Sequence, residues 1–596
     1  MGALFYSSNP RTYARMRSRY ADTPLTVTEL PLGDLQLGLA HAGATPQWHQ
    51  ERDGGVLSSG MVLYEGTAGM DALRRLYRDF VRGQVQGSLS GAFTAAIVHD
   101  GRLTLITDPA GVSELYVHSS TDGWSCSSVL YFLAAAIPGL TLDDFALLER
   151  SFQYSTIDSD TIFREVRKVS ALSCCSVALA DLAARSGPPV TIAKFATAEP
   201  AVADTSAAAL IRIMADEFAC LDQVCSGFDL SCTGGLDSRL QLAAMLAAGV
   251  DRSRIRLVHG VGSSLLTNTK ATDKAIVGEI GEKLGIEVVY KDWSDAELSP
   301  RQWAEALRTS GEAGLVYGAN GRIVQSYIDD ASAGRFQVFG YFGELLRLLE
   351  WQVATGFAQI DIEQFLEFYL YSNFKGFDPE RRRAFLRWMH EKVAACVGGR
   401  RRLDPEDIQA LYTAYRQSAD TAMSRLCSLF GSSHPVLGSQ VFLRALSKVP
   451  SELKVGSRLM IDMIEQAAPA LMEIGIFSHG AIHDHDRAAG RLRLRESAVE
   501  KLRRRLSLGL HRFPRLRHAI RSAYLRTFAS VLGRAGDLEV EARLKVLGAA
   551  AARESGLHDL HLERLAGNPA ALIGFAQFVA MFGWARDAAR QTETDR

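Results

Sequence analysis

The sequence predicts a protein of mixed α/β and α+β class, with a β-rich N-terminal part, a parallel sheet in the middle and a helical C-terminal extension. Three observations support this class: short strand patterns before residue 200, alternating helix and strand patterns from about 205 to 350, and helix patterns beyond. A chain of 596 residues is too long for one hydrophobic core and is expected to form two or three domains. We expect their bounds at 1–200, 205–480 and 481–596.

The N-terminal part contains a clear hairpin pattern. Residues 92–98 and 103–107 form two short apolar, strand-like runs, and Asp100 and Gly101 between them are a strong turn signal. The pattern predicts two neighbouring antiparallel strands.

The middle part begins with the most informative segment of the chain, residues 228–248. An apolar run typical of a buried strand is followed by the turn Thr-Gly-Gly-Leu-Asp-Ser at 233–238 and then by a helix-favouring run. A helix start offers free N–H groups and a positive dipole end to an anion, and a carboxylate there suits magnesium. The turn therefore predicts a phosphate site, with the candidate residues Ser231, Thr233, Gly234, Gly235, Asp237 and Ser238.

Further strand patterns at 255–260, 286–290 and 336–339 alternate with helix patterns at 203–220 and 270–284. This alternation predicts a mostly parallel sheet. Glu344 follows the strand at 336–339, so its carboxylate and that of Asp237 are expected at the same edge of the sheet, where they could share Mg²⁺. The plainer interpretation of Glu344 is an acid favoured at a helix start.

The turn at 233–238 resembles the pyrophosphate loop, Ser/Thr-Gly-Gly-x-Asp-Ser, of ATP pyrophosphatases, and most closely that of asparagine synthetase-like enzymes. Segments 91–116, 160–169, 340–347, 433–437, 446–450 and 454–461 resemble further motifs of that family in the same order. The resemblance covers nearly the first 480 residues. It implies an Ntn-hydrolase-like sandwich of the glutaminase type, followed by an adenine nucleotide α-hydrolase-like sheet with a helical extension.

The resemblance also implies an activity, ATP-dependent amide formation with Mg²⁺. A carboxylate is adenylated, pyrophosphate leaves, and an amine displaces AMP. The positions that match the family's adenine contacts are Val258 and His259, and the loop that closes over ATP matches at Phe339, Gly340 and Tyr341. The family's catalytic lysine matches best at Arg458, with Lys454 as the second choice. Arginine would keep the charge but cannot readily shuttle a proton.

Two departures from the family pattern modify this expectation. Gly2 stands where glutamine-hydrolysing members expose a nucleophilic cysteine, and no cysteine precedes Cys126. The N-terminal part is therefore predicted to release no ammonia, as in β-lactam synthetases and lasso peptide cyclases. Gly343 stands where the family has an aspartate, which leaves Glu344 as the second carboxylate.

Four hypotheses follow for the function. The first is an amide synthetase of specialised metabolism that does not use glutamine, and a lasso peptide cyclase, or macrolactam synthetase, is the nearest alternative. An ammonia-dependent asparagine synthetase is the third. The fourth is a non-catalytic binding homologue, against which the intact 233–238 loop argues, although the altered loop at 340–344 keeps this hypothesis open.

Composition limits the classes of partner and the cellular compartment that we expect for this protein. The formal net charge of −1 gives no reason to expect nucleic acid, and the absence of a long apolar stretch or a signal sequence predicts a cytoplasmic protein without a membrane partner. The eight cysteines are scattered, which is typical of reduced thiols.

Two features near the C-terminal end have weaker interpretations. The basic stretch 487–526, with only Glu496 and Glu500 acidic, is interpreted either as a solvated amphipathic helix or as a surface for a peptide or carrier protein. Residues 483–486, His-Asp-His-Asp, are expected on a loop and are not predicted to converge on a metal ion.

Overall fold

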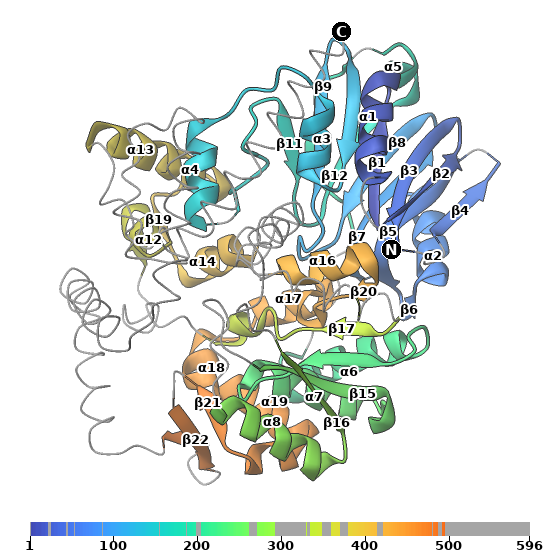
Figure 1. Ribbon diagram of the computed structural model, residues 1–596. Helices are drawn as coiled ribbons and strands as arrows, with labels where there is room; N and C mark the ends of the chain where they lie inside the picture. The colour runs from blue at the N-terminus through green and yellow to red at the C-terminus, as the bar shows by residue number, and fades with distance from the viewer. Residues whose placement is uncertain are drawn as a thin grey trace.

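The computed structural model shows two large antiparallel sheets, one parallel sheet and helices around all three (Figure 1). It describes residues 2–21, 25–42, 46–52, 54–85, 88–153, 155–185, 187–197, 204–261, 271–292, 329, 334–347, 359–369, 379–413, 421–478, 481–486 and 491–494. The described residues also form two small antiparallel sheets, one of three strands after residue 475 and one of the two short strands β18 (Ile360–Asp361) and β19 (Arg402–Leu403). The predicted mixture of antiparallel and parallel sheets is confirmed.

Both large antiparallel sheets belong to the N-terminal part. The first has the strand order β11-β9-β10-β1-β3-β2, and the second the order β13-β12-β8-β7-β5-β4 with β6 beside β5. The strands are β1 Ala3–Ser7, β2 Thr26–Leu32, β3 Leu35–His41, β4 Gln47–Glu51, β5 Gly54–Tyr64, β6 Thr67–Ala68, β7 Leu89–His99, β8 Arg102–Thr107, β9 Leu115–Ser120, β10 Gly123–Ser127, β11 Val166–Val169, β12 Ser173–Ala178 and β13 Ile192–Lys194. The predicted hairpin is β7 and β8, which pair antiparallel across Asp100 and Gly101. Both turn residues have positive φ, 48° and 65°, as a tight two-residue hairpin turn requires.

The two sheets pack face to face with helices outside them. Apolar side chains of both sheets, such as Leu39 from the first and Leu105 from the second, form one buried cluster between them. Helices α1 (Pro10–Ala21) and α3 (Leu130–Ala136) cover the outer face of the first sheet, and α2 (Met70–Val81) packs on the second (Figure 1). The N-terminal part thus has four layers, helix, sheet, sheet and helix. The short helix α5 (Leu179–Ala183) follows β12.

The central sheet is parallel throughout, with the order β16-β15-β14-β17-β20. Its strands are β14 Phe228–Ser231, β15 Ile255–Val261, β16 Glu287–Asp292, β17 Phe336–Val338 and β20 Ser432–Ser433. The four longer strands were predicted, whereas β20 has only two residues and no pattern of its own. From β14 the chain adds β15 and β16 on one side and then continues on the other side with β17. The strand order therefore reverses between β14 and β17, which is where open parallel sheets form ligand crevices.

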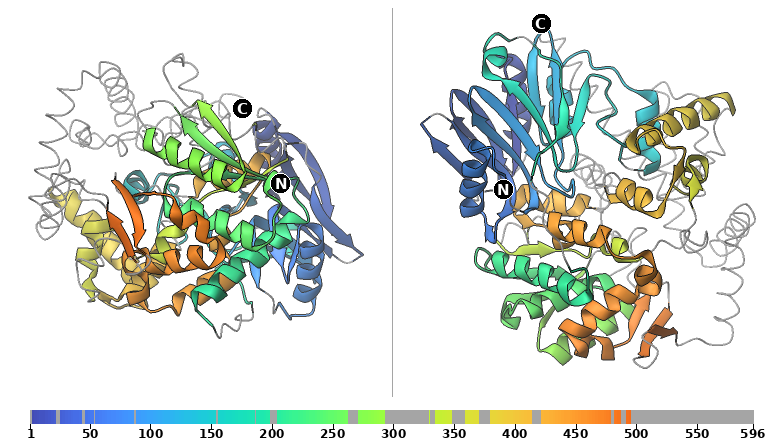
Figure 2. Two further views of the ribbon diagram at one scale, coloured as in Figure 1. Left: turned by 90° about the horizontal axis from the view of Figure 1, so that it is seen from below. Right: turned by 180° about the vertical axis from the view of Figure 1, so that it is seen from behind.

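The helices of this region connect and cover the strands. They are α6 Ala207–Asp222, α7 Leu236–Ala247, α8 Ala271–Leu284, α12 Ile362–Tyr369, α13 Pro379–Cys396, α14 Pro405–Leu411, α16 Ala422–Phe430, α17 Gln440–Ser447, α18 Ser451–Lys454 and α19 Arg458–Ala467. Short 3-10 segments are η1 Arg252–Arg254, η2 Gly343–Leu346, η5 Val436–Gly438, η6 Val455–Ser457 and η7 Pro469–Glu473. Helices α6, α7 and α19 pack on one another. Together with α4 (Asp144–Gln153), α12 and α13 lie to one side of the N-terminal sheets (Figures 1 and 2).

The N-terminal part and the parallel sheet share one hydrophobic core. Ala92 and Val112 from the former belong to the same buried cluster as Phe218 of α6. At the same boundary the Ser90 hydroxyl oxygen lies 3.0 Å from Nε2 of His434. Because this core is continuous, the parallel sheet is held in a fixed position against the N-terminal sheets.

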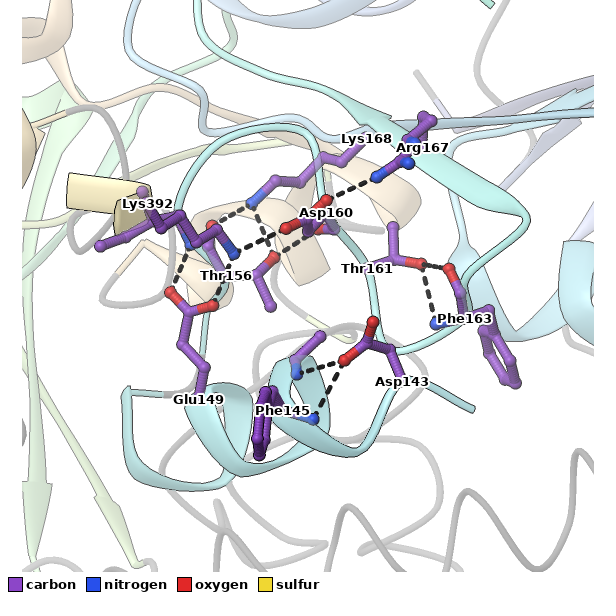
Figure 3. Close-up of polar contacts among 12 residues, drawn as sticks. Asp143, Phe145, Glu149, Thr156, Asp160, Thr161, Phe163, Arg167, Lys168 and Lys392 are labelled. Atoms are coloured by element: carbon purple, nitrogen blue, oxygen red, sulfur yellow. Dashed lines mark hydrogen bonds and ion pairs between the residues drawn. The ribbon is translucent and has the colours of Figure 1, made fainter. Parts of the chain in front are cut away.

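A second contact between the N-terminal part and the helices is ionic and buried (Figure 3). Nζ of Lys392, on α13, lies 2.8 Å from Oε2 of Glu149 on α4 and 3.0 Å from Oδ2 of Asp160. The side chain of Glu149 is fully buried and that of Lys392 is 8% exposed. Burial opposes the charge of Lys392, but Glu149 and Asp160 outweigh burial and raise its pKa. Lys168 donates nearby to the carbonyl of Thr156 at 2.8 Å.

The segment after 475 corrects two expectations. Strands β21 (Ile476–Ser478), β22 (Ala481–Asp486) and β23 (Arg491–Leu494) form a small antiparallel sheet. The expected loop at 483–486 is therefore part of a strand, and the expected helix is wrong for Arg491–Leu494, where basic and apolar residues alternate with the period of two that a strand favours. Residues 495–596, with most of the basic stretch 487–526, lie outside the described residues. Among the helices that the structure describes, none is long and apolar enough to cross a membrane.

Candidate active site at the carboxyl ends of β14 and β17

The loop predicted to bind phosphate lies at the carboxyl end of β14, directly before α7. Its turn is closed internally, because the N–H of Thr233 donates to Oγ of Ser238 at 3.2 Å and the Ser238 hydroxyl donates to the Thr233 carbonyl at 3.1 Å. The N–H of Gly234 donates to Oδ1 of Asp273 at 2.8 Å. The first two hydrogen bonds stabilise the turn, and the bond to Asp273 holds the loop to the first turn of α8.

Helix α7 starts at this loop without a side-chain cap. Gly235 occupies the N-cap position and no side chain accepts a hydrogen bond there, while Asp237 lies in the first helical turn. Uncapped N–H groups and the positive end of the dipole favour an anion at this position. Gly234 must be glycine, because a Cβ there would lie 2.8 Å from Oδ1 of Asp273 and 2.9 Å from Cβ of Phe477.

The buried side chain of Arg239 holds the loop through hydrogen bonds to backbone carbonyls. Its side chain is fully buried and donates to the carbonyls of Leu471 at 2.7 Å, Ile474 at 2.9 Å and Gly234 at 3.2 Å, and also to that of Gly475. One guanidinium thus ties the loop to the segment that follows α19. Sequence reasoning assigned Arg239 no role.

The turn after β17 packs directly on the start of α7. A Cβ on Gly340 would lie 2.9 Å from Cβ of Asp237, and a Cβ on Gly343 would lie 2.0 Å from Oδ1 of the same residue. Phe342 between them is fully buried and has a φ of 69°, a left-handed conformation that a bulky residue rarely adopts. Gly343 therefore leaves no room for the aspartate that the family resemblance would place there.

Asp237 is the centre of this contact. Its Oδ2 accepts a hydrogen bond from Arg347 at 3.2 Å, whereas Oδ1 is buried without a partner among the described residues. Burial raises the pKa of the Asp237 carboxyl above its ordinary value, and the Arg347 guanidinium opposes that rise. Glu344 lies 3.7 Å from the same guanidinium. The two carboxylates predicted to share Mg²⁺ are thus brought together around one arginine.

The residues matched to adenine contacts lie on β15, beside the loop. The carbonyl of Val258 accepts the N–H of Cys232 at 2.9 Å. Nδ1 of His259 lies 2.8 Å from the Cys232 carbonyl, so this nitrogen carries a proton and donates, while the buried Nε2 has no partner among the described residues. Phe339 and Tyr341 stack on each other with ring centroids 5.1 Å apart.

The two candidate cations have very different environments. Arg458 is the first residue of α19, its side chain is 62% exposed, and its nearest carboxylate, Asp462, is 4.0 Å away. Lys454 is buried, and its Nζ donates to Oε1 of Gln409 at 2.9 Å and to the Leu446 carbonyl at 3.1 Å. Burial lowers the pKa of Lys454 to about 8, against the opposing effect of Glu406.

Gln409 connects Lys454 to the turn after β17. Its amide nitrogen donates to the carbonyl of Leu345 at 2.9 Å, next to Glu344. Of the two cations, the structure therefore links Lys454 to the site and leaves Arg458 on the surface.

Besides Arg239 and Gln409, sequence reasoning gave no role to Arg347 and Gln241. Arg347 follows Glu344 at a spacing of three residues, and this spacing could have indicated an ion pair between them. Gln241 lies one helical turn after Asp237, and its buried amide nitrogen and oxygen both lack partners among the described residues. Because native structures rarely leave such atoms unsatisfied, Gln241 and Asp237 mark a place suited to a polar ligand or water.

The described thiols of the N-terminal part are not suited to nucleophilic chemistry. Burial raises the pKa values of Cys126, Cys174 and Cys175, that of Cys175 to about 11. Gly2 has a φ of 143°, and a Cβ there would lie 2.0 Å from the carbonyl oxygen of Ala40. Position 2 thus has no room for the side chain of a cysteine or of any other residue.

The residues at the loop fit a magnesium nucleotide better than a protein-caged metal. No group of three or more metal-binding side chains occurs among the described residues, which include His483–His485. Two carboxylates beside an uncapped helix start suit Mg²⁺ that takes its remaining ligands from phosphate and water. The unpaired Oδ1 of Asp237 is one such carboxylate oxygen.

Comparisons with known proteins supply no family for this chain. A scan against protein-family models finds no match, and a search of curated proteins finds no significant relative.

Proposed function

We propose that the chain is an ATP-dependent amide synthetase that adenylates a carboxylate, releases pyrophosphate and transfers the acyl group to an amine without hydrolysing glutamine. One observation carries the proposal. The Thr-Gly-Gly-Leu-Asp-Ser loop lies where the strand order of a parallel sheet reverses, and Asp237 there has an unpaired carboxylate oxygen. In the same proposal the N-terminal layers are an Ntn-hydrolase-like domain and the parallel sheet is an adenine nucleotide α-hydrolase-like domain.

Each residue of the site has a task in this proposal. The uncapped start of α7, with Thr233 and Ser238, binds the phosphates that leave, and Asp237 and Glu344 hold Mg²⁺. The metal would neutralise phosphate charge. Lys454 supplies the buried positive charge near the transferring group, because it is linked to the site through Gln409, whereas Arg458 is exposed.

The bonds balance in two steps. An oxygen of the substrate carboxylate bonds to the α phosphorus as the bond to the β-phosphate oxygen breaks, and pyrophosphate leaves. The amine nitrogen then bonds to the acyl carbon, AMP leaves, and the amine gives up a proton. The amine comes from the substrate or a second substrate, since Gly2 and the buried thiols offer no nucleophile for glutamine.

The test does not require the natural amine. Purified protein, ATP and Mg²⁺ are incubated with a panel of amino acids, small acids and peptides, with hydroxylamine as trap, and hydroxamate, AMP and pyrophosphate are measured. We expect all three products in equal amounts with a competent acid and none with Asp237→Ala. Asp71→Ala is the matched control, because Asp71 also lies in the first turn of a helix, on α2. Formation of ADP and phosphate instead would refute adenylation.

A further inference from the structure

The guanidinium of Arg347 contacts both carboxylates assigned to the metal. Its Nη2 is 3.2 Å from Oδ2 of Asp237 and 3.7 Å from Oε1 of Glu344. All three side chains are between a quarter and a third exposed, so the ion pairs are only partly screened by water. A cation therefore already lies beside one oxygen of each carboxylate.

The backbone of the turn after β17 packs tightly against Asp237. Gly343 packs against Oδ1 of Asp237 and cannot carry a side chain of its own. The 340–343 turn thus packs directly on Asp237 and admits no further carboxylate at position 343. With Arg347 in place, the three side chains carry a net charge of −1, and without it they carry −2.

We propose that Arg347 takes the place of the divalent cation between Asp237 and Glu344 until nucleotide arrives, so that metal enters with the nucleotide and not alone. This inference rests on the proposed function and deepens it. A divalent ion bound to these carboxylates would lie close to the guanidinium and would be repelled by it. The triphosphate offers the guanidinium other oxygens, to which arginine binds in a bidentate manner, and so releases the carboxylates to the metal.

Binding of Mn²⁺ to the full chain without nucleotide, measured by electron paramagnetic resonance, tests the proposal. We expect wild type and Arg347→Lys, which keeps the charge, to bind Mn²⁺ weakly. Arg347→Gln is expected to bind one Mn²⁺ at least ten-fold more tightly, and Arg347→Gln with Asp237→Asn is expected to lose that site. Arg74→Gln removes an exposed arginine of α2 and controls for the change in net charge.

Two results would overturn the inference. One is Mn²⁺ binding to wild type as tight as to Arg347→Gln, and the other is no gain in Arg347→Gln while circular dichroism shows both proteins folded. The measurement separates this inference from the proposed function. If Arg347→Gln binds Mn²⁺ more tightly but the protein forms no AMP, the result refutes the proposed adenylation and leaves the role of Arg347 standing. If the protein forms AMP but Arg347→Gln gains no Mn²⁺ affinity, the result refutes only the role of Arg347.

Discussion

The Lys454 ammonium donates to the side-chain oxygen of Gln409 at 2.9 Å, and Gln409 in turn donates to the backbone beside Glu344. This relay joins a buried lysine on α18 to the turn that packs on Asp237. It is the only described link between either candidate cation and the proposed site.

The rate of adenylation is predicted to fall as pH rises through about 8. Burial lowers the pKa of Lys454 from 10.5 to about 8, so the folded protein loses this positive charge well below the ordinary range of lysine. We expect an alkaline limb near pH 8 in kcat/KM. In Lys454→Arg this limb should disappear up to pH 9, because arginine stays charged. A purely structural Lys454 would leave the limb unchanged in that variant. Arg458→Gln is the control and should keep the alkaline limb of kcat/KM near pH 8.

Gly343→Ala is predicted to weaken binding of the magnesium nucleotide at least ten-fold. The added Cβ would lie 2.0 Å from Oδ1 of Asp237 and would push the carboxylate out of position. Titration calorimetry with a non-hydrolysable ATP analogue measures the effect. Gly278→Ala, a helical site where Cβ would approach only the Tyr290 hydroxyl at 3.1 Å, should bind normally. Unchanged nucleotide affinity in Gly343→Ala would contradict the prediction, because it would show that the turn can shift to accept a Cβ without displacing Asp237.

Lys392→Met is predicted to destabilise the protein by about 3–5 kcal/mol, because it leaves the fully buried Glu149 without its cation. The double variant Lys392→Met with Glu149→Gln should recover part of the loss, since the buried charge is then removed as well. Urea unfolding followed by tryptophan fluorescence measures both. Arg17→Met, which breaks an exposed pair with Glu29, should change stability by less than about 1 kcal/mol.

Stability is also predicted to fall in acid through Glu114. Burial raises the pKa of this carboxyl, but Arg425 at 2.8 Å, with Lys168 and Arg150, outweighs burial and lowers the pKa from 4.5 to about 2. The lowered folded-state pKa contributes stability above pH 4.5, about 3 kcal/mol, which is lost as pH falls from 4.5 toward 2. Unfolding midpoints measured between pH 6 and 3 should drop less steeply in Glu114→Gln. An equal slope in both proteins would contradict this assignment.

Local patterns predicted the part of the site that is contiguous in sequence. The strand, turn and helix at 228–248 and the next three strands each have their own signature, and parallel pairing brings their carboxyl ends together. The relay from Lys454 was not predictable, because its partners are 45 and 64 residues apart in sequence. Arg347 and Asp237 are 110 residues apart.

Burial decided what sequence spacing could not. In sequence, Arg458 matches the expected position best and Lys454 is the second choice, whereas packing leaves Arg458 exposed and buries Lys454. The error at β23 has a different cause. Leucines at 492 and 494 suit a helix when more distant leucines are added, but over four residues the alternation fits a strand.

The lack of space at position 2 limits how this protein can change. In Gly2→Cys, for example, the new Cβ would meet the carbonyl of Ala40 on the neighbouring strand β3. The backbone of β1 or β3 would first have to shift, and each such shift would disturb paired strands. The pairing of β1 with β3 therefore restricts position 2 to a residue without a side chain.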